Sequence, residues 1–144
     1  AEFDDETYQL YHRYVAFQHQ HEDQDSPKQY RRFLVNSPVD TRIMRYYTDG
    51  RLIGAGWIDV LAEGISSVYF AFDPDAAKRS LGTYSVFQEA SLATTMGKRW
   101  LYLGFYVAVA QKMAYKARFA PHEFARDGVW EPTPSTRSPQ PGPG

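Results

Sequence analysis

A short basic run in the middle of the chain has the residue types and spacing to bind an anion. The run Arg79-Ser80-Leu81-Gly82-Thr83 follows an apolar, strand-like segment that ends at Phe72, and it precedes a helical pattern. Backbone N–H groups at the start of a helix, next to an arginine, can bind a phosphate or an oxyanion. A glycine at this place can also simply permit a tight turn, and the motif alone does not decide between the two interpretations.

A second basic cluster follows later in the chain and contains Lys112, Tyr115, Lys116 and Arg118. If the segment is helical, Lys112, Tyr115 and Lys116 lie on one face at spacings of i, i+3 and i+4. Such a face could bind a phosphate or a carboxylate. The alternative is an amphipathic helix whose charged face is only solvated.

The sequence gives little support for a metal site or for nucleophilic catalysis. A polar segment contains His19, His21, Glu22 and Asp23, and it is interpreted as a solvated patch because no second group of metal ligands accompanies it. No G-x-S-x-G motif is present, and His122 has no evident catalytic partner. The absence of cysteine excludes disulfides, thiolate metal sites and a cysteine nucleophile. The residues therefore give no support for a metal site or for a nucleophilic hydrolase.

The composition is that of a globular protein. The chain has 144 residues, with 43% apolar and 23% charged residues, which fits one domain with its own core. A formal charge of −1 argues against a general nucleic-acid coat but leaves room for a local basic surface. No apolar run is long enough to span a bilayer, and without cysteine a reducing cytoplasm is the expected location.

Start and stop signals predict the elements that must position these residues. The expected elements are a helix capped by Asp4 or Asp5 and reaching Phe17, a short helix from Ser26-Pro27 to Asn36, a hairpin over 41–60 about Asp49-Gly50, a turn at Glu63-Gly64, a strand to Phe72, a helix from Thr83 to Met96 closed by Gly97, a strand over 100–107 and a helix over 111–119 that ends near Pro121. This order predicts an α+β protein with one layered sheet. The proline-rich tail over 131–144 is expected to be disordered.

The basic turn and several longer blocks resemble known transferases. The turn is similar to the phosphate loop of the GNAT acyltransferases, although Tyr84 stands where that loop has a second small residue. The blocks VDTRI, DGRLIGAGWIDVL, SSVYFAFDPD, RSLGTYS, LYLGFYV and KMAYKARFAP resemble, in order and spacing, the C-terminal domain of the aminoacyl-tRNA–protein transferases. The resemblance extends from about Phe3 to Trp130, and we therefore expect one domain over 1–130.

The resemblance implies a GNAT-like fold, a mostly antiparallel sheet flanked by helices, that uses an aminoacyl-tRNA ester in place of a CoA thioester. Because this ester is already activated, the resemblance implies that no metal and no cofactor are required. The implied acceptor is the α-amine of a protein beginning with Asp or Glu, which the transfer marks for degradation in the N-degron pathway. Leucine is the expected donor, because the segments at 39–42 and 79–83 look more like the bacterial leucyl branch, and arginine is the alternative. The family also implies a cysteine-rich domain ahead of this one.

The resemblance also suggests roles for individual residues. Residues 79–83 are expected to hold the phosphate end of the tRNA or to stabilise an oxyanion. Lys112, Lys116 or Arg118, with Tyr115 among them, is expected to pair with the acidic side chain of the acceptor. The residues that could orient the amine or relay its proton are Ser66, Ser67, Tyr69 and Asp73. For these four the alternative is sheet packing, and for Asp73 it is a turn ahead of Pro74.

Two other functions remain open from the sequence. One is a CoA-dependent N-acetyltransferase that uses the same turn. The other is a non-catalytic module that binds acidic N-termini or tRNA without transfer.

Overall fold

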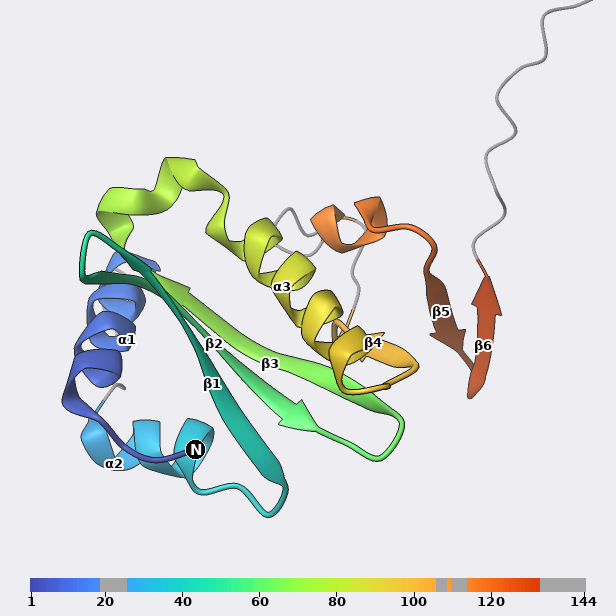
Figure 1. Ribbon diagram of the computed structural model, residues 1–144, viewed down its shortest axis with the longest axis horizontal. Helices are drawn as coiled ribbons and strands as arrows, with labels where there is room; N and C mark the ends of the chain where they lie inside the picture. Colours follow the sequence, from blue (N-terminus) through green and yellow to red (C-terminus); the bar gives the residue numbers. More distant parts are fainter. Residues whose placement is uncertain (19–25, 106–108, 110–113, 133–144) are drawn as a thin grey trace, which may run out of the picture. The chain divides into compact units, whose positions relative to one another are not determined.

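A computed structural model describes residues 1–18, 26–105, 109 and 114–132, and the chain divides into two compact units, Ala1–Gly104 and Phe105–Gly144. The first unit carries a four-stranded sheet, β1 (Asp40–Thr48), β2 (Arg51–Val60), β3 (Gly64–Phe72) and β4 (Trp100–Tyr102), in the order β1-β2-β3-β4 (Figure 1). The β1–β2 and β2–β3 pairs are antiparallel, and β3–β4 is parallel. The predicted α+β class and the β meander are confirmed.

The turn between β1 and β2 has the conformation that its sequence predicts. Asp49 and Gly50 both have positive φ angles, 50° and 75°. Two successive residues of this kind match the twist of an antiparallel pair, which is why Asp-Gly is a strong hairpin signal. The hairpin in turn places Thr48 and Arg51 at one end of the sheet.

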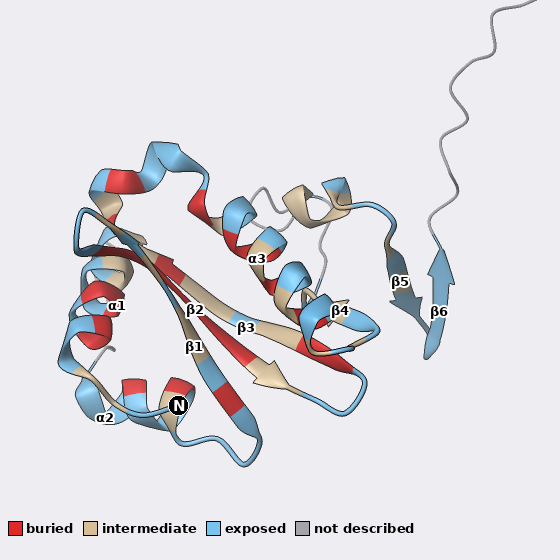
Figure 2. Ribbon diagram, viewed as in Figure 1, coloured by how far each residue is buried: buried red, intermediate tan, exposed pale blue. Residues whose placement is uncertain are grey.

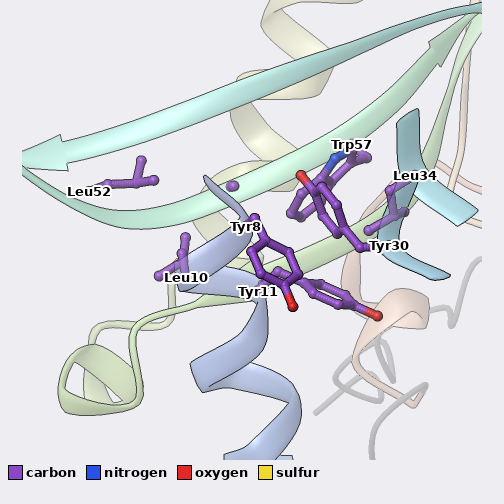
Figure 3. Close-up of a cluster of buried hydrophobic side chains, with 9 residues drawn as sticks. Tyr8, Leu10, Tyr11, Tyr30, Leu34, Leu52 and Trp57 are labelled. Carbon is purple, nitrogen blue, oxygen red and sulfur yellow. The ribbon is translucent and has the colours of Figure 1, made fainter. Parts of the chain in front are cut away.

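Helices α1 (Asp5–Gln18) and α2 (Pro27–Tyr30) and the π-helical turn η1 (Arg31–Val35) pack on one face of the sheet. Asp4 caps α1, because its Oδ1 accepts a 2.8 Å hydrogen bond from the N–H of Thr7. Ser26 and Gln29 form a capping box at the start of α2. The apolar sides of α1, α2 and η1 pack against the sheet and form an aromatic-rich cluster with it (Figure 3). The cluster includes Tyr8, Leu10, Tyr11, Tyr30, Leu34, Leu52 and Trp57.

The opposite face of the sheet is covered by the 3-10 helix η2 (Pro74–Arg79) and by α3 (Leu81–Thr95). Helix α3 begins two residues before the predicted Thr83 and is followed by Gly97, whose φ is +66°. Figure 2 shows buried positions recurring along the side of α3 that faces the sheet. These positions are Leu81, Ser85, Val86, Glu89 and Ala93.

Strand β4 is shorter than predicted. Residues Leu103–Phe105 are not in a strand, and residues 106 and 107 lie outside the described part of the chain. The last strand of the first unit therefore pairs with only three residues of β3, from Gly64 to Ser66. In the described chain, β3 extends six residues beyond this pairing, to Phe72.

The second unit contains the 3-10 helix η3 (Tyr115–Arg118) and a hairpin of β5 (Glu123–Arg126) and β6 (Val129–Pro132). This hairpin is not among the elements predicted from the sequence. Asp127 and Gly128 form its turn, with φ angles of 50° and 80°, as Asp49 and Gly50 do in the first unit. Strand β6 reaches two residues past the boundary expected at Trp130, and residues 133–144 of the expected tail are outside the described chain.

No helix within the described residues is both long and apolar enough to cross a membrane. Within the same residues, no group of three or more histidine, aspartate or glutamate side chains is arranged to hold a metal ion. The cluster at His19, His21, Glu22 and Asp23 lies outside the described residues.

Candidate functional site

The basic turn at 79–83 joins η2 to α3. Arg79 ends η2, is exposed, and donates a 3.1 Å hydrogen bond from Nη1 to Oγ1 of Thr48 at the end of β1. Ser80 follows in the left-handed conformation, with φ of 53°, and Leu81 is buried beneath the start of α3. Gly82 and Thr83 lie in the first turn of the helix.

The structure bears on the two interpretations of Gly82. A tight turn does not depend on this glycine, because Ser80 takes the left-handed conformation and Gly82 is already helical. A Cβ atom added at Gly82 would lie 3.8 Å from its nearest neighbour, a ring carbon of Phe70, which is an ordinary contact. The fold therefore does not require a glycine here, and the glycine leaves the backbone of the first helical turn uncovered.

The first turn of α3 provides N–H groups without a side-chain cap. Ser80 makes no cap hydrogen bond with its side chain, and the helical ladder begins with the 3.1 Å bond from the N–H of Tyr84 to the carbonyl oxygen of Ser80. The N–H groups of Leu81, Gly82 and Thr83 precede this bond and have no acceptor within the helix. They lie at the positive end of the helix dipole, next to the cation of Arg79.

A pocket of about 460 Å³ opens beside this turn. It is lined by Arg79, Leu81 and Tyr84 on the helix side. On the sheet side it is lined by Arg45, Tyr46, Tyr47, Thr48 and Ile53. The pocket therefore connects the turn at 79–83 to the β1–β2 hairpin.

The strand candidates do not share one face of the sheet. β3 has one extra residue, Val68, because Trp57 pairs with Tyr69 whereas Ile58 pairs with Ser67. Ile58 packs with Ala93 of α3, so Ser67 is on the α3 face. Tyr69 contacts the aromatic cluster on the opposite face. Ser66 pairs with Asp59, which by alternation also lies on that opposite face.

Tyr69 is held within aromatic packing. Its ring centroid lies 5.9 Å from that of Trp57 and 5.7 Å from that of Tyr11. Burial raises the pKa of its hydroxyl above the usual range, which disfavours the phenolate. The structure thus gives Tyr69 a packing environment.

The carboxylate of Asp73 is engaged in contacts within the fold. Its side chain is 3% exposed, and its Oδ2 lies 2.5 Å from Nη2 of Arg51 and 3.7 Å from Nη2 of Arg13. Its Oδ1 accepts a 3.0 Å hydrogen bond from the N–H of Asp75 and so caps η2. These contacts match the turn role that the sequence analysis weighs for Asp73.

Helix α3 carries a buried polar group, Glu89, that is not among the residues predicted from the sequence. Glu89 is 1% exposed, and its Oε1 accepts a 2.9 Å hydrogen bond from Oγ of Ser85. Burial raises the pKa of Glu89, while the hydroxyls of Ser85 and Ser67 act in the opposite direction. The available signal is the spacing of Leu81, Ser85, Glu89 and Ala93, which puts a glutamate on the apolar side of the helix.

The second basic cluster falls partly outside the described chain. Lys112 is not among the described residues. Of the helix expected over 111–119, residues 111–113 lie outside the described chain, Ala114 is α-helical, and Tyr115, Lys116 and Arg118 belong to the 3-10 helix η3. Lys116 donates a 2.8 Å hydrogen bond from Nζ to the carbonyl oxygen of Phe105, and burial lowers its pKa. Arg118 is exposed.

Comparison with known proteins identifies a family for nearly the whole chain. The family model described as the C terminus of arginine-tRNA-protein transferase matches residues 6–126. The chain is 37% identical over 135 residues to an aspartate/glutamate leucyltransferase of Acinetobacter baumannii, covering 92% of this chain and 50% of the relative. It is 42% identical over 126 residues to the protein of the same name from Nitrosospira multiformis, covering 86% of this chain and 50% of the relative. The chain therefore spans about half the length of these curated relatives.

Proposed function

Because the chain belongs to the family of the arginine-tRNA-protein transferase C terminus, we propose that it transfers an aminoacyl group from charged tRNA to the N-terminal α-amine of proteins that begin with Asp or Glu. Leucine is the proposed donor, since the relatives are named aspartate/glutamate leucyltransferase. The product carries a new peptide bond at its N-terminus, and this addition marks the acceptor for degradation in the N-degron pathway.

The proposed fold is GNAT-like. The antiparallel strands β1 to β3, the connection through α3 and the parallel β3–β4 pair support it. In this arrangement the basic turn at 79–83 follows a central strand and opens a helix, which suits the binding of a phosphate or an oxyanion. This turn, with Arg79 beside uncapped first-turn N–H groups, is the observation that carries the proposal.

The chemistry requires mainly that two groups be held together. An aminoacyl ester is already activated, and an α-amine with a pKa of about 7.7–8.0 needs only about 1 kcal/mol to be neutral at pH 7. Placing the amine and the ester in contact can lower the barrier by ~7–11 kcal/mol. The residues of the site therefore act chiefly by binding and orienting the two substrates.

Each candidate residue has a proposed place in this scheme. Residues 79–83 bind the 3′ end of the tRNA. Lys112, Lys116 or Arg118 pairs with the acidic side chain of the acceptor. Ser67 is the proposed contact of the amine among the strand candidates, since its hydroxyl is on the α3 face beside the bulge at Val68. Ser66, Tyr69 and Asp73 then support the sheet and the turn.

The experiment uses the complete gene product that carries this chain. It is mixed with radiolabelled leucyl-tRNA and with peptides that begin with Asp, Glu or Ala but are otherwise identical. Label is expected on the Asp and Glu peptides and not on the Ala peptide, and arginyl-tRNA is expected to be a poorer donor. Acetylation of the peptides by acetyl-CoA, or binding of leucyl-tRNA without any transfer, would overturn the proposal.

A further inference from the structure

A chain of hydroxyl groups leads from the pocket beside the basic turn into the core. The hydroxyl oxygen of Tyr46 on β1 lies 3.0 Å from Oγ of Ser85, and Oγ of Ser85 lies 2.9 Å from Oε1 of Glu89. Tyr46 lines the same pocket as Arg79 and Leu81. Ser85 and Glu89 are each 1% exposed, so the chain ends at a carboxyl group in the core.

The direction of these hydrogen bonds follows from the number of protons. Oγ of Ser85 donates its single hydroxyl proton to Oε1 of Glu89, and the relay starts with Glu89 as the carboxylate, which can only accept. Tyr46 then donates its proton to Ser85, since the other acceptor for its hydroxyl among the described residues is the weakly accepting sulfur of Met44 at 3.9 Å. The oxygen of Tyr46 therefore keeps its lone pairs free to accept a hydrogen bond from another donor.

Packing alone does not account for a glutamate at this position. Glu89 forms no ion pair with a described residue, and its Oε2 makes no hydrogen bond of ordinary geometry among them, although the hydroxyl of Ser67 faces the carboxyl group from β3. A buried carboxyl group that is only partly satisfied is costly. The sheet leaves room for the Glu89 side chain because residue 56 is a glycine. A Cβ atom added at Gly56 would lie 3.1 Å from Oγ of Ser85 and 3.5 Å from Oε1 of Glu89.

We propose that Tyr46, Ser85 and Glu89 form a proton relay that takes the proton released by the attacking α-amine. The inference rests on the proposed aminoacyl transfer. As the C–N bond forms, the N–H bond breaks and its proton passes to Tyr46, while Tyr46 passes its own proton to Ser85 and Ser85 passes its proton to Glu89. When the ester C–O bond breaks, the same path returns one proton to the leaving ribose oxygen. The relay ends unchanged, and no other reactant is needed.

Of the three relay residues, only Tyr46 is a catalytic residue, because Ser85 and Glu89 act through it. Tyr46 transfers its proton without storing a charge, which agrees with a phenol pKa that burial raises to about 12. The groups that face Glu89 are Ser85 on its own helix, Ser67 on β3 and, beyond Ser85, Tyr46 on β1. The raised pKa of Glu89 makes it a stronger base than an exposed glutamate.

The test measures single-turnover transfer from leucyl-tRNA to a peptide beginning with Asp, in H2O and in D2O. The variants are Tyr46→Phe, Ser85→Ala and Glu89→Gln. The matched controls are Ser91→Ala on the exposed side of α3 and Glu63→Gln in an exposed turn. Binding of leucyl-tRNA and thermal unfolding are measured for every variant.

Each of the three variants is expected to lower the transfer rate by about 100-fold or more, as loss of general acid–base catalysis does. Leucyl-tRNA binding should stay within about twofold of the wild type. The solvent isotope effect of the wild type should be absent in the variants, and a merely structural role would leave it unchanged. The controls should behave as the wild type.

Transfer by Glu89→Gln and Ser85→Ala at the wild-type rate, with the isotope effect retained, would overturn the relay while leaving the proposed function intact. No transfer by the wild type would instead reject the proposed function, and the relay with it. If Glu89→Gln does not fold, Ser85→Ala decides, because it interrupts the relay without altering the carboxyl group.

Discussion

Oγ of Ser85 donates a 2.9 Å hydrogen bond to Oε1 of Glu89 one turn later on α3, and both side chains are shielded from solvent between the helix and the sheet. A carboxyl group in this position is neutral more readily than one in water, because burial penalises its charged form. The same pair links the pocket beside Arg79, through Tyr46, to the core. Stability and the proposed chemistry therefore depend on the same few atoms.

The buried Glu89 predicts a pH-dependent stability. Its pKa in the folded protein is raised above the ordinary value of 4.5. The folded state then binds a proton at Glu89 more tightly than the unfolded state does. The resulting contribution to the free energy of unfolding is fully present below the unfolded pKa and is lost as pH rises through the folded pKa. Urea unfolding of the wild type and Glu89→Gln should give a stability difference that changes across this range. A difference that is constant with pH would contradict the prediction.

Asp73 should matter more for stability than for catalysis. Asp73→Ala removes the cap of η2 and the partner of Arg51 and Arg13, and it should lower the free energy of unfolding by about 1–3 kcal/mol. Asp75→Ala is the matched control, since that side chain is 85% exposed and its change should stay within about 0.5 kcal/mol. Chemical denaturation measures both. Equal losses for the two variants would show that Asp73 has no special structural role.

Gly82→Ala should separate stability from function. The added methyl group meets only Phe70 at 3.8 Å and replaces a glycine inside a helix, so the free energy of unfolding should stay the same or rise by up to about 1 kcal/mol. Transfer from leucyl-tRNA should fall, because the methyl group covers the first-turn N–H groups. Gly97→Ala should have the opposite effects. Because Gly97 has a φ of +66°, the substitution should lower the free energy of unfolding by about 1 kcal/mol and leave transfer unchanged. A Gly82→Ala variant with full activity would contradict the assignment of the turn.

Gly64→Ala should disrupt the parallel pair of β3 and β4. A Cβ atom at this position would lie 2.7 Å from the carbonyl oxygen of Trp100 and 2.7 Å from a ring carbon of Tyr102, and backbone cannot move aside cheaply. The expected cost is about 1–3 kcal/mol, as for other overpacked sites. Thermal unfolding compared with Gly82→Ala provides the measurement. Equal stability of the two variants would be inconsistent with the close approach of β4.

Elements set by local chemistry could be predicted from the sequence. The first hairpin is confirmed because Asp49-Gly50 joins two segments rich in β-branched and aromatic residues. Asp127-Gly128 forms the same kind of turn, but EFAR has a single aromatic residue and VWEP ends in a proline, so the strand signal beside this turn is weak. The sequence predicts a start of α3 at Thr83, after Gly82, but the helix begins at Leu81 because Ser80 adopts the left-handed conformation.

The arrangement of the site depends on features that no local pattern encodes. A single extra residue at Val68 decides that Ser67 faces α3 while Tyr69 faces the aromatic cluster. Glu89 becomes a candidate only when α3 lies against Gly56 and Ser85 meets Tyr46, a residue 39 positions earlier in the chain. Tertiary packing assigns these roles, and residue type alone does not.

The most direct test compares Arg79→Ala with Lys78→Ala in the complete gene product, by measuring labelled leucine transferred from leucyl-tRNA to the α-nitrogen of a peptide beginning with Asp. Both side chains are exposed neighbours at the end of η2, but only Arg79 lines the pocket. The wild type and Lys78→Ala should transfer label at similar rates, and Arg79→Ala should be slower by about tenfold or more, the loss expected for one charge-assisted hydrogen bond. Absence of label with the wild type, or full transfer by Arg79→Ala, would contradict the role assigned to this turn.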